Sequence, residues 1–145
     1  MRLSARVEYA AIAALNIACR GERHGPVSLR AICEEQGVPS RFLVHILLQL
    51  KRAGIVQSTR GASGGYLLAR PADEITLLDI YLAIEGPVEC PAVVTAGLAG
   101  KSRGATVLKA AWEAGCQAGA GALASQSLAD LAARTLNASE PMYFI

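Results

Sequence analysis

Residues 40–70, SRFLVHILLQLKRAGIVQSTRGASGGYLLAR, decide the fold of this chain. In residues 41–53 the apolar side chains recur three and four positions apart, which predicts an amphipathic helix. Two short apolar runs follow at residues 55–59 and 66–68, separated by a glycine-rich segment, and this pattern predicts a β-hairpin. A helix followed by a hairpin that carries a cation at its turn is typical of a winged helix-turn-helix, which indicates a nucleic-acid binder rather than a catalyst.

The two faces of the predicted helix at residues 41–53 differ in chemistry. At about 100° per residue, the face expected in the core collects Phe42, Leu43, Ile46, Leu47 and Leu50. The opposite face carries Arg41, Val44, His45, Leu48 and Arg52. Cations on this face can bind phosphate or guanine, and aliphatic side chains can meet thymine methyl groups. The alternative is that Val44 and Leu48 pack against another element of the same protein.

The turn of the predicted hairpin, RGASGG at residues 60–65, is the second candidate DNA-binding element. Its glycines permit positive φ and a close approach of the backbone to phosphate or to a minor groove. Arg60, between Thr59 and Gly61, would carry its charge into the concentrated negative potential of a narrow minor groove. The alternative is a surface hairpin with a solubilising arginine.

The residues before this stretch complete a helix-turn-helix. A first helix is predicted over residues 4–19 and a second over residues 29–36. Ser28 can cap the second helix and Gly37 can end it. Ser40 can then cap the helix that follows, and two short helices around a glycine-containing turn form the motif.

Charge is unevenly divided along the 145 residues, whose net charge is +2. Residues 1–70 hold ten Lys and Arg against four Asp and Glu, a net +6, whereas residues 71–145 hold four against eight, a net −4. The basic half coincides with the predicted winged helix, as a polyanionic partner would require. The alternative is a chance imbalance on a solvated surface.

The second half of the chain predicts further helices. Thr76 and Asp79 form a capping box that opens a helix to about residue 84, and a long helix is expected over residues 103–124, followed by a last helix to about residue 136. A long helix after a DNA-binding head indicates dimerisation. The expected fold is mainly α with a small β-hairpin wing, divided into a winged helix-turn-helix head (1–85), a sensor or connecting loop (86–102), and a dimerisation helix with a C-terminal helix (103–145).

Composition argues against membrane, secreted and catalytic classes. No apolar run is long enough to span a membrane, and Glu8 and Asn16 interrupt the stretch that resembles a signal peptide. Four cysteines without a paired framework favour reduced thiols, so we expect a cytoplasmic protein. Residues 97–102, GLAGKS, end like a phosphate-binding loop, but the full motif needs glycine where Thr95 stands. A nucleotide-binding enzyme is therefore disfavoured, and the +6 half argues against an interaction module that has lost DNA binding.

Two segments carry a family resemblance: VSLRAICEEQGVPSRFLVHILLQLKRAGIVQSTRGASGGYLLAR, residues 27–70, and ITLLDIYLAIEG, residues 75–86. They resemble the winged-helix transcriptional regulator family that includes the iron–sulfur cluster regulator IscR and the nitric-oxide-sensitive repressor NsrR. The resemblance covers nearly the whole chain, and RGxxGGYxLAR is its most specific motif. It implies a homodimeric transcription factor, usually a repressor, that binds a palindromic promoter site in double-stranded DNA.

In such a family the recognition helix enters the major groove and the wing arginine enters the minor groove. The DNA-binding residues that we expect are Ser28, Ser40, Arg41, Val44, His45, Leu48, Arg52, Thr59, Arg60 and Gly61. Some members of the family carry Glu-Gln where this chain has Val44 and His45, so the base sequence that these members read cannot be transferred to it.

The sensor is where the chain departs from its family. Many members hold an iron–sulfur cluster with three closely spaced cysteines before the tryptophan of the long helix, but here only Cys90 lies in that region. Three interpretations stay open. Cys90 and Cys116 could hold a cluster together with Glu8 of a partner subunit, or Cys90 could act as a reversible thiol switch. The sequence favours the third, in which both cysteines are small hydrophobic residues and no cofactor is bound, and Cys19 and Cys33 are expected in the core.

Overall fold

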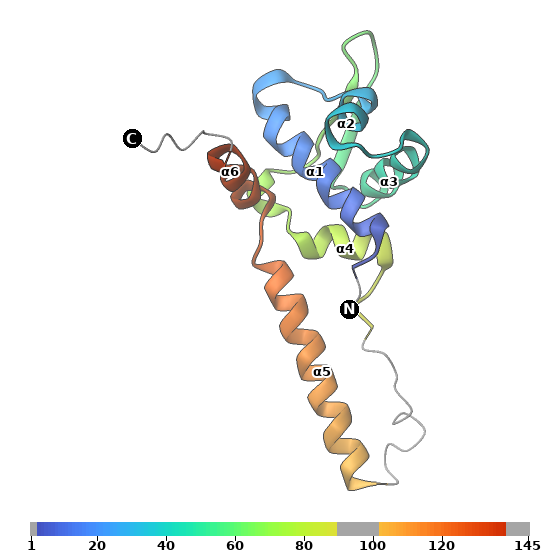
Figure 1. Ribbon diagram of the computed structural model, residues 1–145, viewed down its shortest axis with the longest axis vertical. Helices are drawn as coiled ribbons and strands as arrows, with labels where there is room; N and C mark the ends of the chain where they lie inside the picture. Colours follow the sequence, from blue (N-terminus) through green and yellow to red (C-terminus); the bar gives the residue numbers. More distant parts are fainter. Residues whose placement is uncertain (1–2, 90–101, 139–145) are drawn as a thin grey trace.

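The computed structural model describes residues 3–89 and 102–138, and its first part forms a winged head (Figure 1). A long helix extends away from this head, and the last helix returns to its side. The elements in chain order are α1 (Ala5–His24), α2 (Leu29–Gln36), α3 (Ser40–Arg52), β1 (Val56–Thr59), β2 (Gly65–Leu68), the 3-10 turn η1 (Ala72–Glu74), α4 (Leu77–Glu85), α5 (Arg103–Ala124) and α6 (Leu128–Ala138). The expected fold class, mainly α with a β-hairpin wing, is confirmed. None of the described helices is long and apolar enough to cross a bilayer.

Local capping signals determine where several helices begin and end. The Ser28 hydroxyl accepts a hydrogen bond from the backbone N–H of Ala31 at 3.1 Å and so caps α2. Gly37 ends that helix in the left-handed conformation, at φ 66°. The capping box of Thr76 and Asp79 is present at the start of α4. These three predictions from the sequence are confirmed.

Two helix boundaries differ from the sequence prediction. Helix α1 continues to His24 instead of ending at residue 19. Arg23 and His24 stabilise its last turn, because cationic side chains interact favourably with the negative end of the helix dipole. Gly25 then ends the helix, because it adopts a positive φ of 76°. Ser40 does not cap α3. It is the first helical residue, and the carbonyl of Pro39 accepts the first hydrogen bonds of the helix. The ring of Pro39 restricts its φ to values near the observed −62°, which suits the residue that precedes the first turn of α3.

Helix α1 lies at the centre of the core. Its buried face is lined by Ala10, Ala13, Ala14 and Ile17, and it contacts α3, α4 and α6. The largest fully buried side chains of the other elements are Ile32, Leu43, Ile46, Leu47, Leu50, Ile55, Val56, Ile75, Ile80 and Leu128. Small side chains on α1 let these helices approach closely and bury the larger residues around it.

The prediction for Phe42 is wrong. We expected it in the core with Leu43 and Ile46, which are buried, but its side chain is 43% exposed. Phe42 lies at the edge of the apolar face of α3, where its ring stacks on Tyr9 of α1 with centroids 6.4 Å apart. An aromatic ring at a helix edge can bury one side against a neighbouring helix and leave the other in solvent.

A polar network joins α1 to α2. The buried Asn16 donates from Nδ2 to a carboxylate oxygen of Glu35 at 2.8 Å, and Arg20 forms an ion pair with the same carboxylate. Because both donors lie on one face of α1, the network fixes the first helix of the helix-turn-helix to the central helix. Asn16 Oδ1 is buried without a hydrogen-bond partner in the described part of the chain.

Helix α6 is attached to the head by a short backbone bridge. Leu77 donates its N–H to the carbonyl of Gln126 at 3.0 Å, and Leu128 donates to the carbonyl of Ile75 at 2.8 Å. Leu128 is fully buried. The predicted division of the chain at residues 85 and 102 stays a prediction, but α6 packs on the same core as α1.

We expect Leu128→Ala to lower the free energy of unfolding by about 2–5 kcal/mol, because it leaves a cavity in the core. Leu136→Ala is the matched control, since Leu136 lies in the same helix with its side chain 40% exposed. Its effect should stay within roughly 0.5 kcal/mol. Urea denaturation of both variants measures the difference, and equal losses would contradict the docking of α6 on the head.

Candidate nucleic-acid interface

The exposed face of α3 combines cationic and aliphatic side chains. Val44 and Leu48 are 49% and 43% exposed, and Arg41, His45 and Arg52 are exposed beside them. The face therefore lies outward as the periodicity predicted. The exposure of the two aliphatic residues argues against the alternative that they pack within the described part of the chain.

The position of Arg41 is supported by an aromatic stack. Its guanidinium carbon lies 4.7 Å from the centroid of the Phe42 ring, and Phe42 in turn stacks on Tyr9. A cation–π contact at an exposed site contributes roughly 0.5–1 kcal/mol and leaves the charge available to an anion. The stack thus holds a cation at the start of α3, where helix-turn-helix proteins contact base edges.

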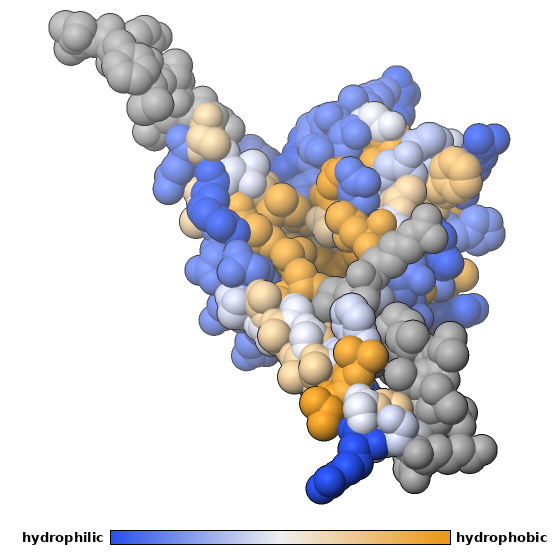
Figure 2. Space-filling model, turned by 60° about the horizontal axis from the view of Figure 1, so that its bottom comes forward, coloured by the Kyte–Doolittle hydropathy of each residue, from blue (hydrophilic) through white to orange (hydrophobic). Residues whose placement is uncertain are grey.

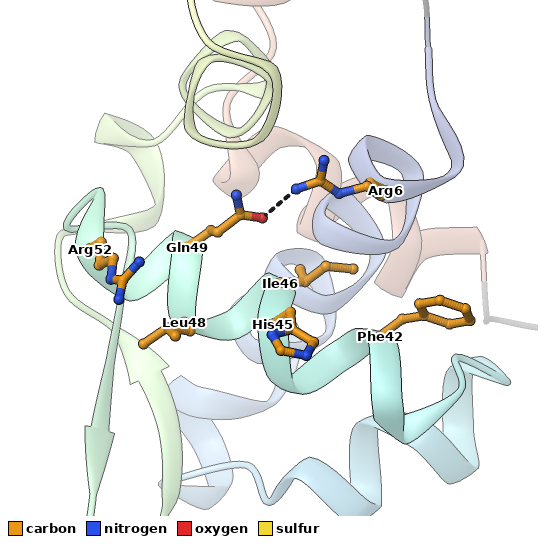
Figure 3. Close-up of a pocket in the computed structure, with 7 residues that line it drawn as sticks. All are labelled: Arg6, Phe42, His45, Ile46, Leu48, Gln49 and Arg52. Atoms are coloured by element: carbon orange, nitrogen blue, oxygen red, sulfur yellow. Dashed lines mark hydrogen bonds between the residues drawn. The ribbon is translucent and has the colours of Figure 1, made fainter.

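A depression of about 450 Å³ lies beside this face, between α1 and α3 (Figure 3). It is lined by Arg6, Phe42, His45, Ile46, Leu48, Gln49 and Arg52. Arg6 of α1 donates from Nη2 to Oε1 of Gln49 at 2.8 Å. Neither Arg6 nor Gln49 was among the residues expected from the sequence, because their meeting depends on how α1 crosses α3, which no local pattern encodes.

The wing is a two-stranded antiparallel hairpin. Its register pairs Val56 with Leu68 and Thr59 with Gly65. The turn between the strands contains Gly61 at φ 114° and closes with a hydrogen bond from Gly64 N–H to the Gly61 carbonyl at 3.0 Å. Thr59, Arg60 and Gly61 are exposed, and Arg60 makes no hydrogen bond or ion pair within the described residues.

Backbone contacts fix the wing to the helix-turn-helix. Val27 and Tyr66 exchange two hydrogen bonds, at 2.9 and 2.8 Å, which place the second strand beside the start of α2. Gly65 makes this approach possible, because a Cβ there would lie 2.5 Å from the carbonyl oxygen of Val27. At the other strand, Lys51 Nζ of α3 donates to Ser58 Oγ at 2.6 Å. The exposed face of α3 and the wing are therefore held in one fixed relation.

The two serines expected at the interface lie at helix starts. Ser28 is exposed and lines a hollow of about 320 Å³ together with wing residues 62–64. Its hydroxyl oxygen accepts the capping hydrogen bond of α2, and its hydroxyl hydrogen remains able to donate. Ser40 is exposed at the first position of α3 and makes no capping bond.

The described residues do not assemble a metal site. No three His, Cys, Asp or Glu side chains among residues 3–89 and 102–138 lie close enough to hold one ion. Cys90 lies outside the described residues, so its three interpretations stay predictions. Cys19 and Cys33 are half-buried instead of lying fully in the core. Burial raises the pKa of the Cys19 thiol, which keeps it protonated and a poor nucleophile.

The segment that resembles a phosphate-binding loop lies mostly outside the described residues. Its last residue, Ser102, caps α5 by accepting a hydrogen bond from the N–H of Ala105 at 3.4 Å. That hydroxyl is thus engaged in starting a helix, which the capping preference of serine explains without a nucleotide.

Known proteins share both the sequence and the fold. Residues 3–134 match the family Rrf2, described as an iron-dependent transcriptional regulator. A helix-turn-helix transcriptional regulator from Synechocystis is 40% identical over 89 residues, which are 61% of this chain and 60% of that protein, so this chain aligns with less than two thirds of that relative's length.

Two solved structures cover most of the chain. IscR from T. potens has a TM-score of 0.74 at 33% sequence identity and covers 96% of this chain, with 91% of that chain matched. CymR from B. subtilis, the global cysteine regulator, has a TM-score of 0.67 at 28% identity, with 92% and 98% covered. IscR, whose family the sequence resembles, is thus also a structural neighbour.

We expect Gly65→Ala to weaken the attachment of the wing. The new Cβ would meet the backbone of Val27, so the bridge to Tyr66 must open, and the free energy of unfolding should fall by about 1–3 kcal/mol. Amide hydrogen exchange at Val27 and Tyr66 should accelerate. Gly121→Ala is the control, because a Cβ there meets no atom within 4 Å and should add up to about 1 kcal/mol of helix stability. Unchanged exchange at the bridge would contradict this account.

Proposed function

This chain belongs to the Rrf2 family of transcriptional regulators, and we propose that it is a homodimeric repressor that binds a palindromic promoter site through α3 and the wing. The observation that carries the proposal is the exposed cationic and aliphatic face of α3, held beside a wing whose Arg60 has no partner among residues 3–89 and 102–138. The expected location is the cytoplasm, where bacterial promoters lie.

In the proposed complex, α3 lies in the major groove. Arg41 reaches a guanine edge or a phosphate, and Val44 and Leu48 meet thymine methyl groups. His45 offers ring nitrogens to a base edge. Ser28, Ser40 and Arg52 contact phosphates around the groove and fix the position of the helix on the duplex.

The wing enters the adjacent minor groove in this proposal. Arg60 has no partner among the described residues, so its charge is available to the negative potential of a narrow groove. Gly61 lets the backbone of the turn approach the sugar-phosphate chain, and Thr59 can donate a hydrogen bond to a phosphate. Because the wing is already attached to α2 and α3, the hairpin loses little conformational entropy when DNA binds.

The proposed dimer is based on the composition of α5. One face of this helix repeats at alternating steps of four and three residues through Leu108, Trp112, Gly115, Gly119 and Ala122. Its first half carries bulky side chains and its second half carries small ones. An antiparallel partner helix places the bulky half of each copy against the small half of the other, whereas a parallel partner would set tryptophan against tryptophan.

An apolar groove of about 650 Å³ provides the receiving surface. Figure 2 shows apolar side chains gathered in a hollow on this side of the molecule. The groove is lined by Leu3, Val7, Glu8, Ala11, Ile12, Leu77, Tyr81, Gly119 and Leu123. Trp112, 53% exposed in a single copy, would be buried when α5 of one copy meets Gly119 of the other. Such an arrangement sets two heads on a two-fold axis, as a palindromic site requires.

The proposal assigns no step to a metal. The family is described as iron-dependent, but the described residues do not bring three potential ligands together. Glu8 lines the apolar groove and Cys116 is half-buried in α5, while Cys90, the third candidate of the set, lies outside the described residues. The iron content and the visible spectrum of anaerobically purified protein test for a cluster directly.

We expect Arg60→Ala to weaken binding to a duplex that the protein itself has selected from a random-sequence pool. Loss of the contact between this cation and a phosphate or the minor groove should lower the affinity roughly tenfold. It should also reduce the slope of log affinity against log salt concentration by about one, and weaken the discrimination between base pairs at the minor-groove positions. Arg103→Ala removes the same charge at the first residue of α5, outside α3 and the wing, and should leave all three unchanged. An unchanged affinity of the Arg60 variant across the salt series would exclude this role.

We expect Trp112→Ala to shift the protein towards monomer. Truncation of a central aromatic contact should raise the dimer dissociation constant by roughly 30-fold, equivalent to about 2 kcal/mol. Val107→Ala is the control, because Val107 is 70% exposed on the same helix but lies off the repeating face. Analytical ultracentrifugation distinguishes the two variants, and a Trp112 variant that dimerises as tightly as wild type would overturn the proposed pairing.

A further inference from the structure

We propose that the depression between α1 and α3 is a seat for a backbone phosphate of the bound DNA, and that Arg6 of α1 is the residue that holds this phosphate. The inference rests on the proposed function and extends the interface beyond the helix-turn-helix and the wing to the first helix of the chain.

The depression lies where DNA bound to α3 would cover it. His45, Leu48 and Arg52 belong both to the exposed face of α3 and to the lining of the depression. Arg6 reaches it from the other side, out of α1 (Figure 3). A recognition helix inside a major groove has a sugar-phosphate strand along each flank. Arg6 lies on the flank that faces away from the wing strands, so a phosphate strand rather than a base edge is the nearest DNA group.

The charge of the lining fits a phosphate. Two guanidinium groups and an imidazole line the depression, and none of the seven lining residues carries a carboxylate. Arg6 has a neutral hydrogen-bond partner in Gln49, and no ion pair involves it within the described residues. The positive charge of Arg6 is therefore not neutralised by a described carboxylate, as expected for a side chain that binds an anion.

Other arginines of the head show the contrasting arrangement. Arg20 pairs with Glu35, Arg30 with Glu34 at 2.6 Å, and Arg70 with Asp79 at 3.8 Å. These residues brace helices or turns within the fold. Of the arginines in residues 3–89 that have a side-chain acceptor there, only Arg6 is paired with an amide rather than an acid.

The geometry also pre-organises the guanidinium. The neighbouring Val7 is buried and anchors this turn of α1, and the buried Ile46 belongs to the lining of the depression. The bond to Gln49 Oε1 at 2.8 Å uses one guanidinium N–H of Arg6 and leaves the others free to donate. An oxyanion in the depression would thus meet donors already in place, which lowers the entropic cost of the contact.

A phosphate contact and a bracing contact predict different outcomes. A residue that contacts phosphate raises the affinity for every DNA sequence and makes binding more dependent on salt. A residue that only holds α1 against α3 changes neither the affinity for random DNA nor the salt dependence through its charge. Arg6→Ala, Arg6→Lys and Gln49→Ala separate the two roles, because Gln49→Ala breaks the bracing bond and keeps the cation. Arg103→Ala is the control for the loss of one charge outside α1, α3 and the wing.

The test measures dissociation constants for the selected duplex and for a random duplex between about 50 and 200 mM salt. For Arg6→Ala we expect a loss of roughly tenfold on both duplexes and a salt slope smaller by about one. Arg6→Lys should keep the slope, and Gln49→Ala and Arg103→Ala should keep both slope and affinity within about threefold.

Three results would overturn the assignment of Arg6 while wild-type protein still binds its selected duplex. These are an unchanged slope for Arg6→Ala, a loss for Gln49→Ala equal to that for Arg6→Ala, and a loss confined to the selected duplex. A wild-type protein that binds no duplex in a salt-dependent way would instead refute the proposed function itself.

Discussion

The packing of α1 against α2, α3, α4 and α6 is the constraint on which the rest of the structure depends. Ala10, Ala13 and Ala14 present only methyl groups on its buried face, so α3, α4 and α6 approach it closely. A larger side chain at any of these positions would push the recognition helix away from the core. The small side chains of α1 therefore determine where α3 and its exposed face lie.

Much of this fold could be predicted from the sequence because its signals are local. The caps at Ser28 and Thr76, the apolar period of α3 and the glycine-rich turn each fix a boundary within a few residues. Features that depend on how elements meet could not be predicted. Phe42 is exposed because of Tyr9, and Arg6 meets Gln49 only because α1 crosses α3. The site residues that sequence reasoning missed all belong to this second kind.

The interface also shows how a small head can hold two DNA-binding elements in register. Lys51 and Ser58 join the end of α3 to the first strand, while Val27 and Tyr66 join the start of α2 to the second. The wing is thus attached at both of its strands to the motif beside it. Its spacing from α3 is therefore set within the fold before any DNA is bound.

Helix α1 lines two separate hollows of the molecule, and this has a consequence for the proposed complex. Arg6 faces the depression beside α3, whereas Val7 and Glu8 line the apolar groove beside α5. In the proposed complex, a group that fills the groove contacts the same helix whose Arg6 binds a phosphate. By thermodynamic linkage, whatever strengthens one contact through a shift of this helix changes the other by the same free energy. In the proposed complex, a single turn of α1 therefore separates the dimer contact from the phosphate contact.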